Sequence, residues 1–294
     1  MNAPLPLACL QPSPTPAHTP DHAPDTADLL IATLLAHGID TVFGYPGGAV
    51  LPLYDALHRE PRLRHVLVRH EQAAVHAAQG YARSTGRIGV VFVTSGPGMS
   101  NTTTGLLDAL CDSVPVLCIS GQVATTSIGT DAFQECDALG ISRPVTKWNA
   151  RVRSAAQLVP LLRKALAVAA GGRPGPVLLD LPKDVQLAPQ VPVHANGWAP
   201  EPRPARPNAS LRRAVDALRE ARRPVFYGGG GLINAGPAAC AAFAELVRRW
   251  QEPIRRLCVR MTGDAHRGED LAQEAFARVF AKRQDFEPGR KFST

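Results

Sequence analysis

Glu71 is the residue whose type and position most clearly suggest chemistry. It lies in the stretch VLVRHEQAAVHAAQGYAR (residues 66–83), where a short apolar run rich in β-branched residues passes directly into a helix-forming segment. A carboxylate at the end of a strand lies where α/β folds bind ligands, and there it can hold or transfer a proton. The alternative is a solvated glutamate in a first helical turn, favoured by the helix dipole. The neighbouring segments favour the first interpretation.

Glycine-rich turns follow two other apolar runs. Gly47 and Gly48 come after TVFGYP, and a Gly-Pro-Gly turn at residues 96–98 comes after IGVVFVTS. Because glycine lacks a Cβ atom, the backbone at these turns could approach a ligand closely. An ordinary turn explains the same glycines almost as well.

A long polar loop is predicted from Gln122 to Arg143. Loops of this length inside a compact domain usually have a functional role. The glycine run Gly228–Gly231 is different, because it lacks the GxGxxG spacing of a nucleotide-binding βαβ unit. We interpret that run as a tight strand-to-helix turn.

Alternating strands and helices must position these residues. Strands are expected in the segments TVFGY, VLV, IGVVFVTS, VPVLCISG and PVLLDLP. One helix is expected from Thr26 until Gly38, and a second between the Pro-Gly-Gly turn and Leu57. Further helices are expected to begin after Glu71 and after a cap at Ser100 or Asn101, and a last one is expected from Ala155 to Ala169. The strands are continuously apolar rather than alternating. This pattern predicts an α/β fold with a parallel sheet covered by helices on both faces.

The composition is that of a globular protein. The chain has 294 residues, of which 45% are apolar and 5% aromatic, and no apolar run is long enough to span a membrane. The six cysteines form no CxxC pair and no metal-ligand spacing, so we expect free thiols, no metal site and a reducing cytoplasmic location. The formal net charge is +7, but the basic residues are spread along the chain. Charge alone therefore does not indicate nucleic-acid binding.

Two Pro-rich segments divide the chain. Residues 1–25 have too few apolar side chains to offset their ordering entropy, so we predict a disordered leader, without the features of a signal or transit peptide. Residues 188–209 are predicted to be an interdomain linker. Beyond it we expect a helix, a strand, the glycine turn and the start of another helix. Two amphipathic helices are then expected at 244–261 and 265–282, with Pro253 kinking or restarting the first.

Six collinear segments carry a family resemblance: FGYPGGAVLPLYDAL, VRHEQAAVHAAQGYAR, VTSGPGMSNTTTGLLDA, SGQV with IGTDAFQE, ISRPVTKWN and GRPGPVLLDLPKDV. Together they resemble the N-terminal portion of the acetolactate synthase (acetohydroxyacid synthase) large subunit. The resemblance implies that residues 26–187 are the pyrimidine-binding domain of a thiamine diphosphate enzyme. It also implies that residues 210–244 are part of the family's central, FAD-associated domain.

The resemblance gives Glu71 a role that suits a carboxyl group. In thiamine enzymes such a group hydrogen-bonds the pyrimidine ring nitrogen of the cofactor and favours its imino tautomer, which removes the thiazolium C2 proton. Burial of the carboxyl would help it to share that proton.

Other site residues follow from the same motifs. Gly48 resembles the glycine that lets substrate and thiazolium approach the backbone. Phe133 and Gln134 match the family's active-site loop, where Gln134 would hydrogen-bond substrate. Lys183 matches a lysine that would attract the carboxylate of a 2-keto acid, and Arg173 matches an FAD contact. For Lys183 and Arg173 a solvated side chain at a strand edge is the alternative.

As a whole the resemblance implies condensation of pyruvate with pyruvate or 2-ketobutyrate, a transfer of a two-carbon unit in isoleucine and valine biosynthesis. The implied cofactors are thiamine diphosphate, FAD and Mg²⁺. The implied assembly is a homodimer or a higher oligomer. A small regulatory subunit is a further partner that the resemblance implies. The family usually has proline at the position of Ala124, which lines its inhibitor channel. The family's GDG motif with paired asparagines is missing, so we expect no turnover from this chain alone.

Residues 245–294 resemble a different protein family. The segments RMTGD and EDLAQEAFARVF are similar to region 2 of an extracytoplasmic-function sigma factor, which implies RNA polymerase core or promoter DNA as a partner. No helix-turn-helix segment follows. The sequence thus leaves open an acetolactate synthase portion, a transcription-initiation protein, and a non-catalytic chimera of the two.

Overall fold

The computed structural model describes residues 23–191, 209–221, 228–267 and 270. The chain divides into two compact units, Met1–Pro202 and Arg203–Thr294. The division falls within the segment predicted to be a linker. Most of that linker and most of the predicted leader lie outside the described residues.

A six-stranded sheet forms the centre of the first unit, with the strand order β2-β1-β3-β4-β6-β5. Its strands are β1 (Thr41–Tyr45), β2 (Arg64–Leu67), β3 (Gly89–Val93), β4 (Val116–Gln122), β5 (Trp148–Arg151) and β6 (Pro176–Pro182). Every neighbouring pair is parallel. The predicted α/β class with a parallel sheet is therefore confirmed. The sequence did not predict β5, a partly buried edge strand that pairs only with β6.

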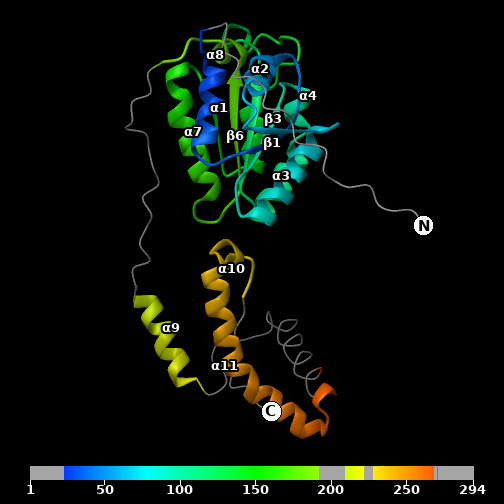
Figure 1. Ribbon diagram of the computed structural model, residues 1–294, viewed down its shortest axis with the longest axis vertical. Coiled ribbons are helices and arrows are strands. Elements are labelled where there is room, and N and C mark those ends of the chain that lie inside the picture. The colour runs from blue at the N-terminus through cyan, green and yellow to red at the C-terminus, as the bar shows by residue number, and fades with distance from the viewer. Residues whose placement is uncertain (1–22, 192–208, 222–227, 268–269, 271–294) are drawn as a thin grey trace, which may run out of the picture. The chain divides into compact units, whose positions relative to one another are not determined.

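Helices cover both faces of the sheet (Figure 1). On one face, α1 (Thr26–Ala36), α2 (Leu51–Arg59) and α7 (Ala155–Ala170) share a buried cluster with alternate strand residues such as Val90 and Phe92. On the other face, α3 (Glu71–Thr85), α5 (Thr103–Cys111) and α6 (Ala138–Ser142) share a second cluster that includes Val91 and Val93. Burial on both faces explains why the strands are apolar throughout.

Local capping explains where several of these helices begin and end. Asp25 is the N-cap of α1 and forms a capping box with Asp28, and Gly38 adopts φ +74° just after the helix. The helix expected to start near residue 100 is instead two helices, α4 (Pro97–Ser100) and α5. Pro97 starts the first of them at its N1 position, where its missing N–H has no intrahelical partner to lose.

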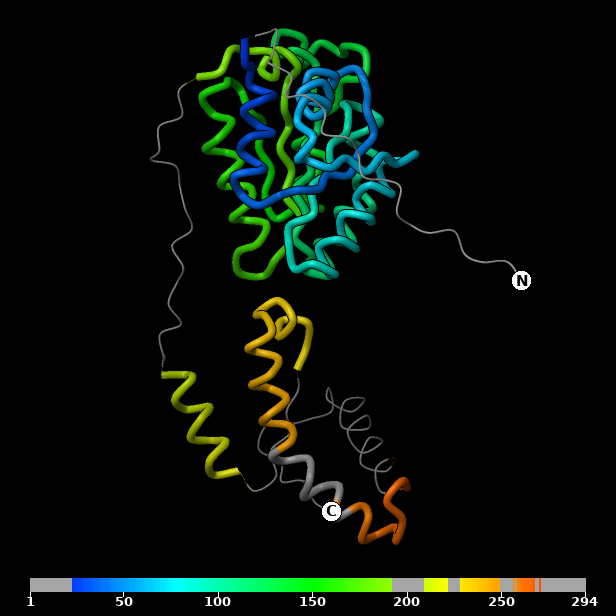
Figure 2. The backbone as a smooth tube through the Cα atoms, in the orientation of Figure 1, coloured from blue at the N-terminus to red at the C-terminus, as the bar shows by residue number. Residues whose placement is uncertain are grey.

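In the second unit the described elements are all helices: α9 (Ala209–Glu220), α10 (Gly231–Asn234) and α11 (Pro237–Thr262). The helix predicted at 244–261 lies inside α11, which begins earlier and continues past Pro253 without restarting. Figure 2 traces the backbone of the described helices. The strand expected before the glycine turn and most of the helix expected at 265–282 lie outside the described residues.

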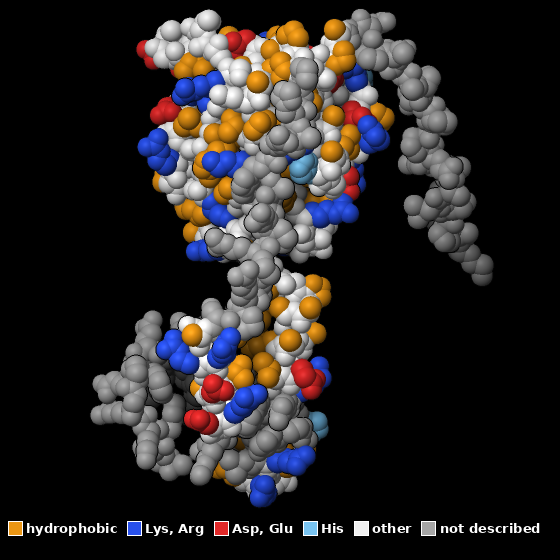
Figure 3. Space-filling view, turned by 90° about the vertical axis from the view of Figure 1, so that its left-hand side faces the viewer, with side chains coloured by type: hydrophobic (Ala, Val, Ile, Leu, Met, Phe, Trp, Pro, Cys, Tyr) orange, Lys and Arg blue, Asp and Glu red, His pale blue; other side chains and the backbone are white. Residues whose placement is uncertain are grey.

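On the face shown in Figure 3, the Lys and Arg side chains of the first unit lie apart from one another, among acidic and apolar ones. Among the described helices, none combines the length and apolar content needed to cross a membrane.

Candidate active site

The strand order creates a topological switch point at the carboxyl ends of β1 and β3. From β1 the chain moves outward to β2, then returns to β3 on the other side of β1. The connecting helices α2 and α3 consequently pack on opposite faces of the sheet. Open parallel sheets bind ligands at such a switch point. The turns after β1 and β3 and the start of α3 all lie at this edge.

Glu71 is the first residue of α3 and is only 7% exposed, so it is not a solvated surface glutamate. The side-chain amide of Asn101 donates to its Oε2 at 2.9 Å. Within the described part of the chain, Oε1 accepts no hydrogen bond. A Cβ atom at Gly98 would lie 3.4 Å from Oε1, so this oxygen faces the Gly-Pro-Gly turn. One carboxylate oxygen is thus held while the other is available to a ligand.

Two titratable neighbours remain neutral close to this site. The hydroxyl of partly buried Tyr54 donates to the carbonyl oxygen of Phe92 at 3.3 Å and lies 3.4 Å from Nε2 of His65. Burial, followed by the nearby negative charge of Glu71, raises the pKa of Tyr54. Burial also lowers the pKa of His65. Neither side chain supplies a positive charge to Glu71 near neutral pH.

The two glycines after β1 have different surroundings. A Cβ atom at Gly47 would lie 2.6 Å from Cβ of Thr94, so packing between β1 and β3 requires glycine there. A Cβ atom at Gly48 would meet no described atom within 4 Å. The chain's own packing therefore does not require glycine at position 48, and the space beside it is open to a ligand.

The loop with Phe133 and Gln134 reaches the same edge of the sheet. A Cβ atom at Gly96, whose φ is +55°, would lie 2.6 Å from the carbonyl oxygen of Gln134. The Gly-Pro-Gly turn therefore touches Gln134 at one end and Glu71 at the other. Phe133 is 88% exposed. Gln134 and Glu71 therefore both lie against the Gly-Pro-Gly turn.

Lys183 begins α8 (Lys183–Gln186) directly after β6 and is partly exposed. This helix is joined to the neighbouring turn because buried Gln186 donates to the carbonyl oxygen of Ala49 at 2.7 Å. Ala49 follows Gly48 in the 3₁₀ turn η1 (Gly48–Val50). Lys183 and Gly48 therefore lie on connected segments at the carboxyl edge.

Arg173 lies at the opposite edge of the sheet, just before β6 begins. Its guanidinium donates to Oγ of Ser113 at 2.7 Å and to the carbonyl oxygens of Leu110 and Cys111 at 3.1 and 2.9 Å. It thereby caps the C-terminal end of α5. The structure does not bring Arg173 near Glu71, and its contact with FAD stays a prediction.

Sequence reasoning missed a buried polar network next to the site. Asp180 on β6 is fully buried, and Nε of Arg151 donates to its Oδ2 at 2.6 Å. The side-chain amide of Gln122 lies 3.5 Å from the same oxygen. Burial raises the pKa of Asp180 to about 6, against the lowering effect of Arg151. The signal in the sequence was a lone acidic residue within the apolar run PVLLDLP.

Asn101 was also missed as a functional residue, since it was considered only as a helix cap. Its contact with Glu71 joins residues 30 positions apart, which no local pattern reveals. Among the described residues, no cluster of His, Cys, Asp and Glu could hold a metal ion.

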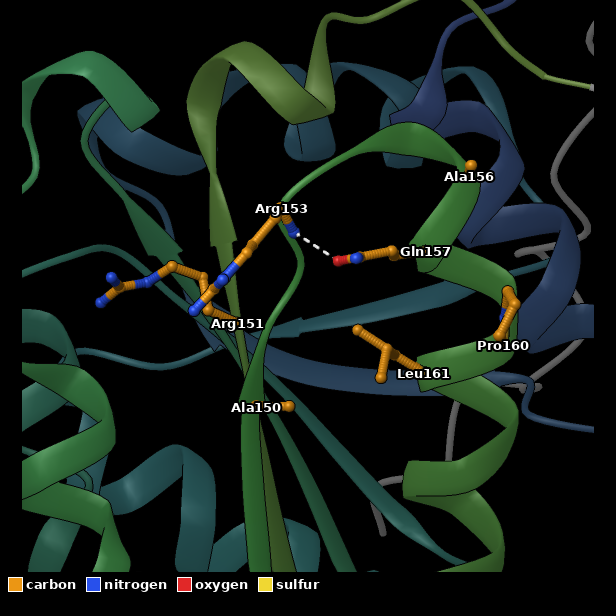
Figure 4. A pocket seen from close by; sticks show the side chains of 7 residues that line it. All are labelled: Ala150, Arg151, Arg153, Ala156, Gln157, Pro160 and Leu161. Atoms are coloured by element: carbon orange, nitrogen blue, oxygen red, sulfur yellow. Dashed lines mark hydrogen bonds between the residues drawn. The ribbon is translucent and has the colours of Figure 1, made fainter.

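Two cavities among the described residues lie outside the candidate site. A groove of about 390 Å³ runs between β5 and the start of α7, lined by Ala150, Arg151, Arg153, Ala156, Gln157, Pro160 and Leu161 (Figure 4). Another, of about 440 Å³, lies at the amino edge of the sheet near His37 and Arg87. Neither includes Glu71.

Comparison with known proteins agrees with this geometry. Residues 24–141 match the family of thiamine pyrophosphate enzymes, N-terminal TPP binding domain, and residues 246–294 match Sigma-70 region 2. The chain is 50% identical over 215 residues to the acetolactate synthase isozyme 3 large subunit of Escherichia coli, covering 71% of this chain and 38% of that protein. It is 47% identical over 228 residues to the mitochondrial acetolactate synthase catalytic subunit of Saccharomyces cerevisiae, covering 74% and 33%.

The chain spans between a third and two fifths of the length of these relatives. The match to the TPP-binding domain family agrees with the α/β fold of the first unit. Residues 24–141 belong to the N-terminal TPP-binding domain family of thiamine pyrophosphate enzymes, and about three quarters of the chain is similar to the N-terminal part of acetolactate synthase large subunits.

Proposed function

We propose that the first unit provides the pyrimidine-binding half of a thiamine diphosphate site of the acetolactate synthase type. The observation that carries this proposal is the buried carboxylate of Glu71, with Oε2 held by Asn101 and Oε1 available at a sheet edge. It occurs in a domain whose family binds thiamine pyrophosphate.

The residues at this edge suit such a ligand. The open space at Gly48 accommodates a ring close to the backbone, and the missing Cβ of Gly98 leaves Oε1 of Glu71 uncovered. A ring nitrogen that carries or accepts a proton is a natural partner for that oxygen. Thiamine diphosphate, when bound, supplies a carbon nucleophile that attacks the carbonyl group of a 2-keto acid.

The remaining site residues have roles toward the substrate in this proposal. Lys183 attracts the carboxylate of the 2-keto acid, and the side-chain amide of Gln134 hydrogen-bonds one of its oxygens. Phe133, exposed on the same loop, covers the site and excludes water. Glu71 holds a proton between Oε1 and the ring nitrogen.

The finer features rest on the similarity to acetolactate synthases. They are condensation of pyruvate with pyruvate or 2-ketobutyrate, a role in isoleucine and valine biosynthesis, and a cytoplasmic location. They also include FAD bound with the help of Arg173, Mg²⁺ at the diphosphate, a homodimer or larger assembly, and a small regulatory subunit.

Replacing Glu71 tests the proposal. Glu71→Gln keeps the size of the side chain but removes its charge, so we expect thiamine diphosphate to bind the full chain about tenfold or more weakly. Titration calorimetry with Mg²⁺ present measures this. Glu71→Asp, which keeps the carboxyl group one methylene farther back, should lose less affinity.

A hybrid enzyme provides the activity measurement. Residues 23–191 would replace the equivalent part of the E. coli large subunit, and acetolactate formation from pyruvate would be followed. We expect turnover in the hybrid and its loss with Glu71→Gln. Near-normal turnover of that variant would contradict the assigned role.

A second function is favoured by the match of residues 246–294 to Sigma-70 region 2. In this alternative, the segment binds RNA polymerase core. A pull-down of core polymerase by the full chain, compared with a chain ending at residue 243, tests it, and no recovery would remove the alternative. Sequencing DNA continuously across the codons for residues 238–256 tests whether the two similarities belong to one reading frame.

A further inference from the structure

Gln122 is a fully buried side chain at the end of β4 whose amide touches both ends of one loop. Its Oε1 accepts a hydrogen bond from the backbone N–H of Val123 at 2.9 Å. Its Nε2 donates to the backbone carbonyl oxygen of Cys136, also at 2.9 Å. We call residues 123–136 the clamped loop. One amide therefore closes a loop of irregular backbone at the edge of the sheet.

The buried carboxylate of Asp180 orients this amide. Oδ2 of Asp180 lies 3.5 Å from Nε2 of Gln122 and is also paired with Arg151. A carboxylate accepts hydrogen bonds and does not donate them. Asp180 therefore favours the amide orientation in which the NH₂ group of Gln122 points toward it. The amide oxygen is then directed to Val123. Oδ1 of Asp180 has no partner among the described residues and can take a proton without releasing Oδ2.

The clamped loop needs such a restraint because part of its backbone is unfavourable for its residues. Gln134 has φ +59°, in the left-handed region that residues other than glycine, asparagine and aspartate rarely adopt, and Asp131 lies in the same region with φ +56°. Such conformations persist only where the surroundings determine them. Within the loop, the carboxylate of Glu135 binds the backbone N–H groups of Gly129 and Thr130. The bond from Gln122 to Cys136 attaches this preformed turn to the sheet.

The attachment point lies two residues beyond Gln134, whose carbonyl oxygen packs against Gly96. Gly98, at the other end of that turn, packs against Glu71. Holding the carbonyl of Cys136 therefore limits how far Gln134 can move from Glu71.

We propose that Gln122 is a positioning residue, which holds the clamped loop over the Gly-Pro-Gly turn and so sets the place of Gln134 relative to Glu71. The inference deepens the proposed function and rests on it for the role of Gln134. The hold itself involves no ligand, so an experiment on the unliganded chain distinguishes failure of this inference from failure of the proposed function.

Hydrogen–deuterium exchange of the full chain tests the hold directly. Gln122→Met keeps the approximate size of the side chain but removes both hydrogen bonds. Amides of the clamped loop, such as the N–H of Glu135 bonded to Ala132, should exchange about tenfold faster than in the wild-type chain. Amides of β3 should keep their wild-type rates.

Gln122→Glu makes the hold on the loop depend on pH. If Gln122 only filled space, loop exchange in this variant would not change with pH. The neutral carboxyl can donate to the carbonyl of Cys136, whereas the ionised one cannot. The charged groups around this position are Asp180 on β6, Arg151 on β5 and Asp137 just after the loop. After correction for intrinsic rates, loop exchange in this variant should match wild type near pH 5 and become about tenfold faster as the introduced carboxyl ionises at higher pH.

Gln79→Met is the matched control. Gln79 is also a buried amide, and it donates to the carbonyl oxygen of Gly105 rather than to the loop. In the Gln79→Met chain we expect the amides of the clamped loop to exchange at the wild-type rate. Three results would each overturn the inference: a folded Gln122→Met chain with wild-type loop exchange, equal loop acceleration in Gln79→Met, or a Gln122→Glu chain whose loop exchange does not depend on pH. If Gln122→Met does not fold, the pH series decides.

Discussion

At the scale of single residues, Glu71 shows how the surroundings define a carboxylate. Its position at the start of a helix would suit any solvated glutamate. Burial, a single amide donor on Oε2 and an uncovered Oε1 make it a group that can share a proton with a ligand. Asn101 contributes because an amide can donate a hydrogen bond without taking the proton away.

Gly47 and Gly48 are adjacent glycines, but we expect substitution by alanine to affect protein stability at one and ligand binding at the other. Gly47→Ala places a methyl group 2.6 Å from Cβ of Thr94, so we expect a loss of about 1–3 kcal/mol in unfolding free energy. Gly48→Ala meets no atom within 4 Å and should leave stability nearly unchanged while weakening thiamine diphosphate binding. Urea unfolding and titration calorimetry on both variants check this pair. The reverse assignment of the two effects would refute the view that only position 48 faces a ligand.

Asp180 should make the stability of the first unit depend on pH in a direction unusual for an aspartate. Burial raises its pKa from 3.8 to about 6 in the folded protein, so the folded state binds the proton more tightly than the unfolded chain. This group therefore favours folding as the pH falls from about 6 towards 4, and that contribution is lost as the pH rises through 6.

The variant Asp180→Asn removes this titration. The measured quantity is the unfolding free energy of wild type minus that of Asp180→Asn. We expect this difference to increase by up to about 3 kcal/mol as the pH is lowered from neutral to about 4. Urea unfolding at a series of pH values measures the difference. A constant difference would show that folding does not change the pKa of Asp180, and a difference that falls with acidification would show that folding lowers it.

At the scale of elements, the connection after β4 is more structured than a loop. The predicted polar loop from Gln122 to Arg143 includes the 3₁₀ turn η2 (Thr125–Ser127) and helix α6. Asp137 caps α6 by accepting a hydrogen bond from the N–H of Gly140 at 3.0 Å. The longest irregular part lies between these elements and carries Phe133 and Gln134.

Ala124, where the family usually has proline, already has a backbone suited to it. Its φ of −53° and ψ of 147° are compatible with a proline ring, and its N–H makes no backbone hydrogen bond among the described residues. We expect Ala124→Pro to stabilise the chain by about 0.4–1 kcal/mol, because proline restricts the unfolded state.

Thermal unfolding measures the effect, and Thr125→Pro is the control. The N–H of Thr125 donates to Oδ1 of Asp184 at 3.0 Å, so proline there removes a hydrogen bond and should destabilise. Equal effects at both positions would mean that the local backbone does not control the result.

At the scale of the whole molecule, the two units differ in how well they bury apolar side chains. The first unit has two continuous cores on either side of its sheet. In the second unit, several large apolar side chains are exposed, including Val215 at 40%, Ile233 at 74% and Met261 at 71%. The boundary expected near residue 245 between the two family similarities falls inside the continuous helix α11.

Exposed apolar surface predicts self-association through the second unit. We expect the full chain to elute from size-exclusion chromatography as larger or mixed species at micromolar concentration. Residues 1–202 alone should give a narrower peak, because the two buried cores of the first unit hold most of its described apolar side chains. A monodisperse, cooperatively melting full chain would contradict the prediction.

Short-range patterns were enough to determine the α/β class, five of the six strands and the position of Glu71 between a strand and a helix. Continuous apolar runs, helix caps and glycine turns depend on residues close together along the chain, and local physical chemistry governs them. The edge strand β5 was missed because WNAR has no apolar pattern and forms only by pairing with β6.

Tertiary structure alone decided the rest of the site. The bonds from Asn101 to Glu71 and from Gln122 towards Asp180 join residues 30 and 58 positions apart, and the Gln122–Cys136 bond closes a loop. The placement of Arg173 at the opposite edge, and the contrast between Gly47 and Gly48, depend on which strands become neighbours. The reason is physical: the sequence sets the local backbone, whereas the order of strands in the sheet sets which side chains share a buried space.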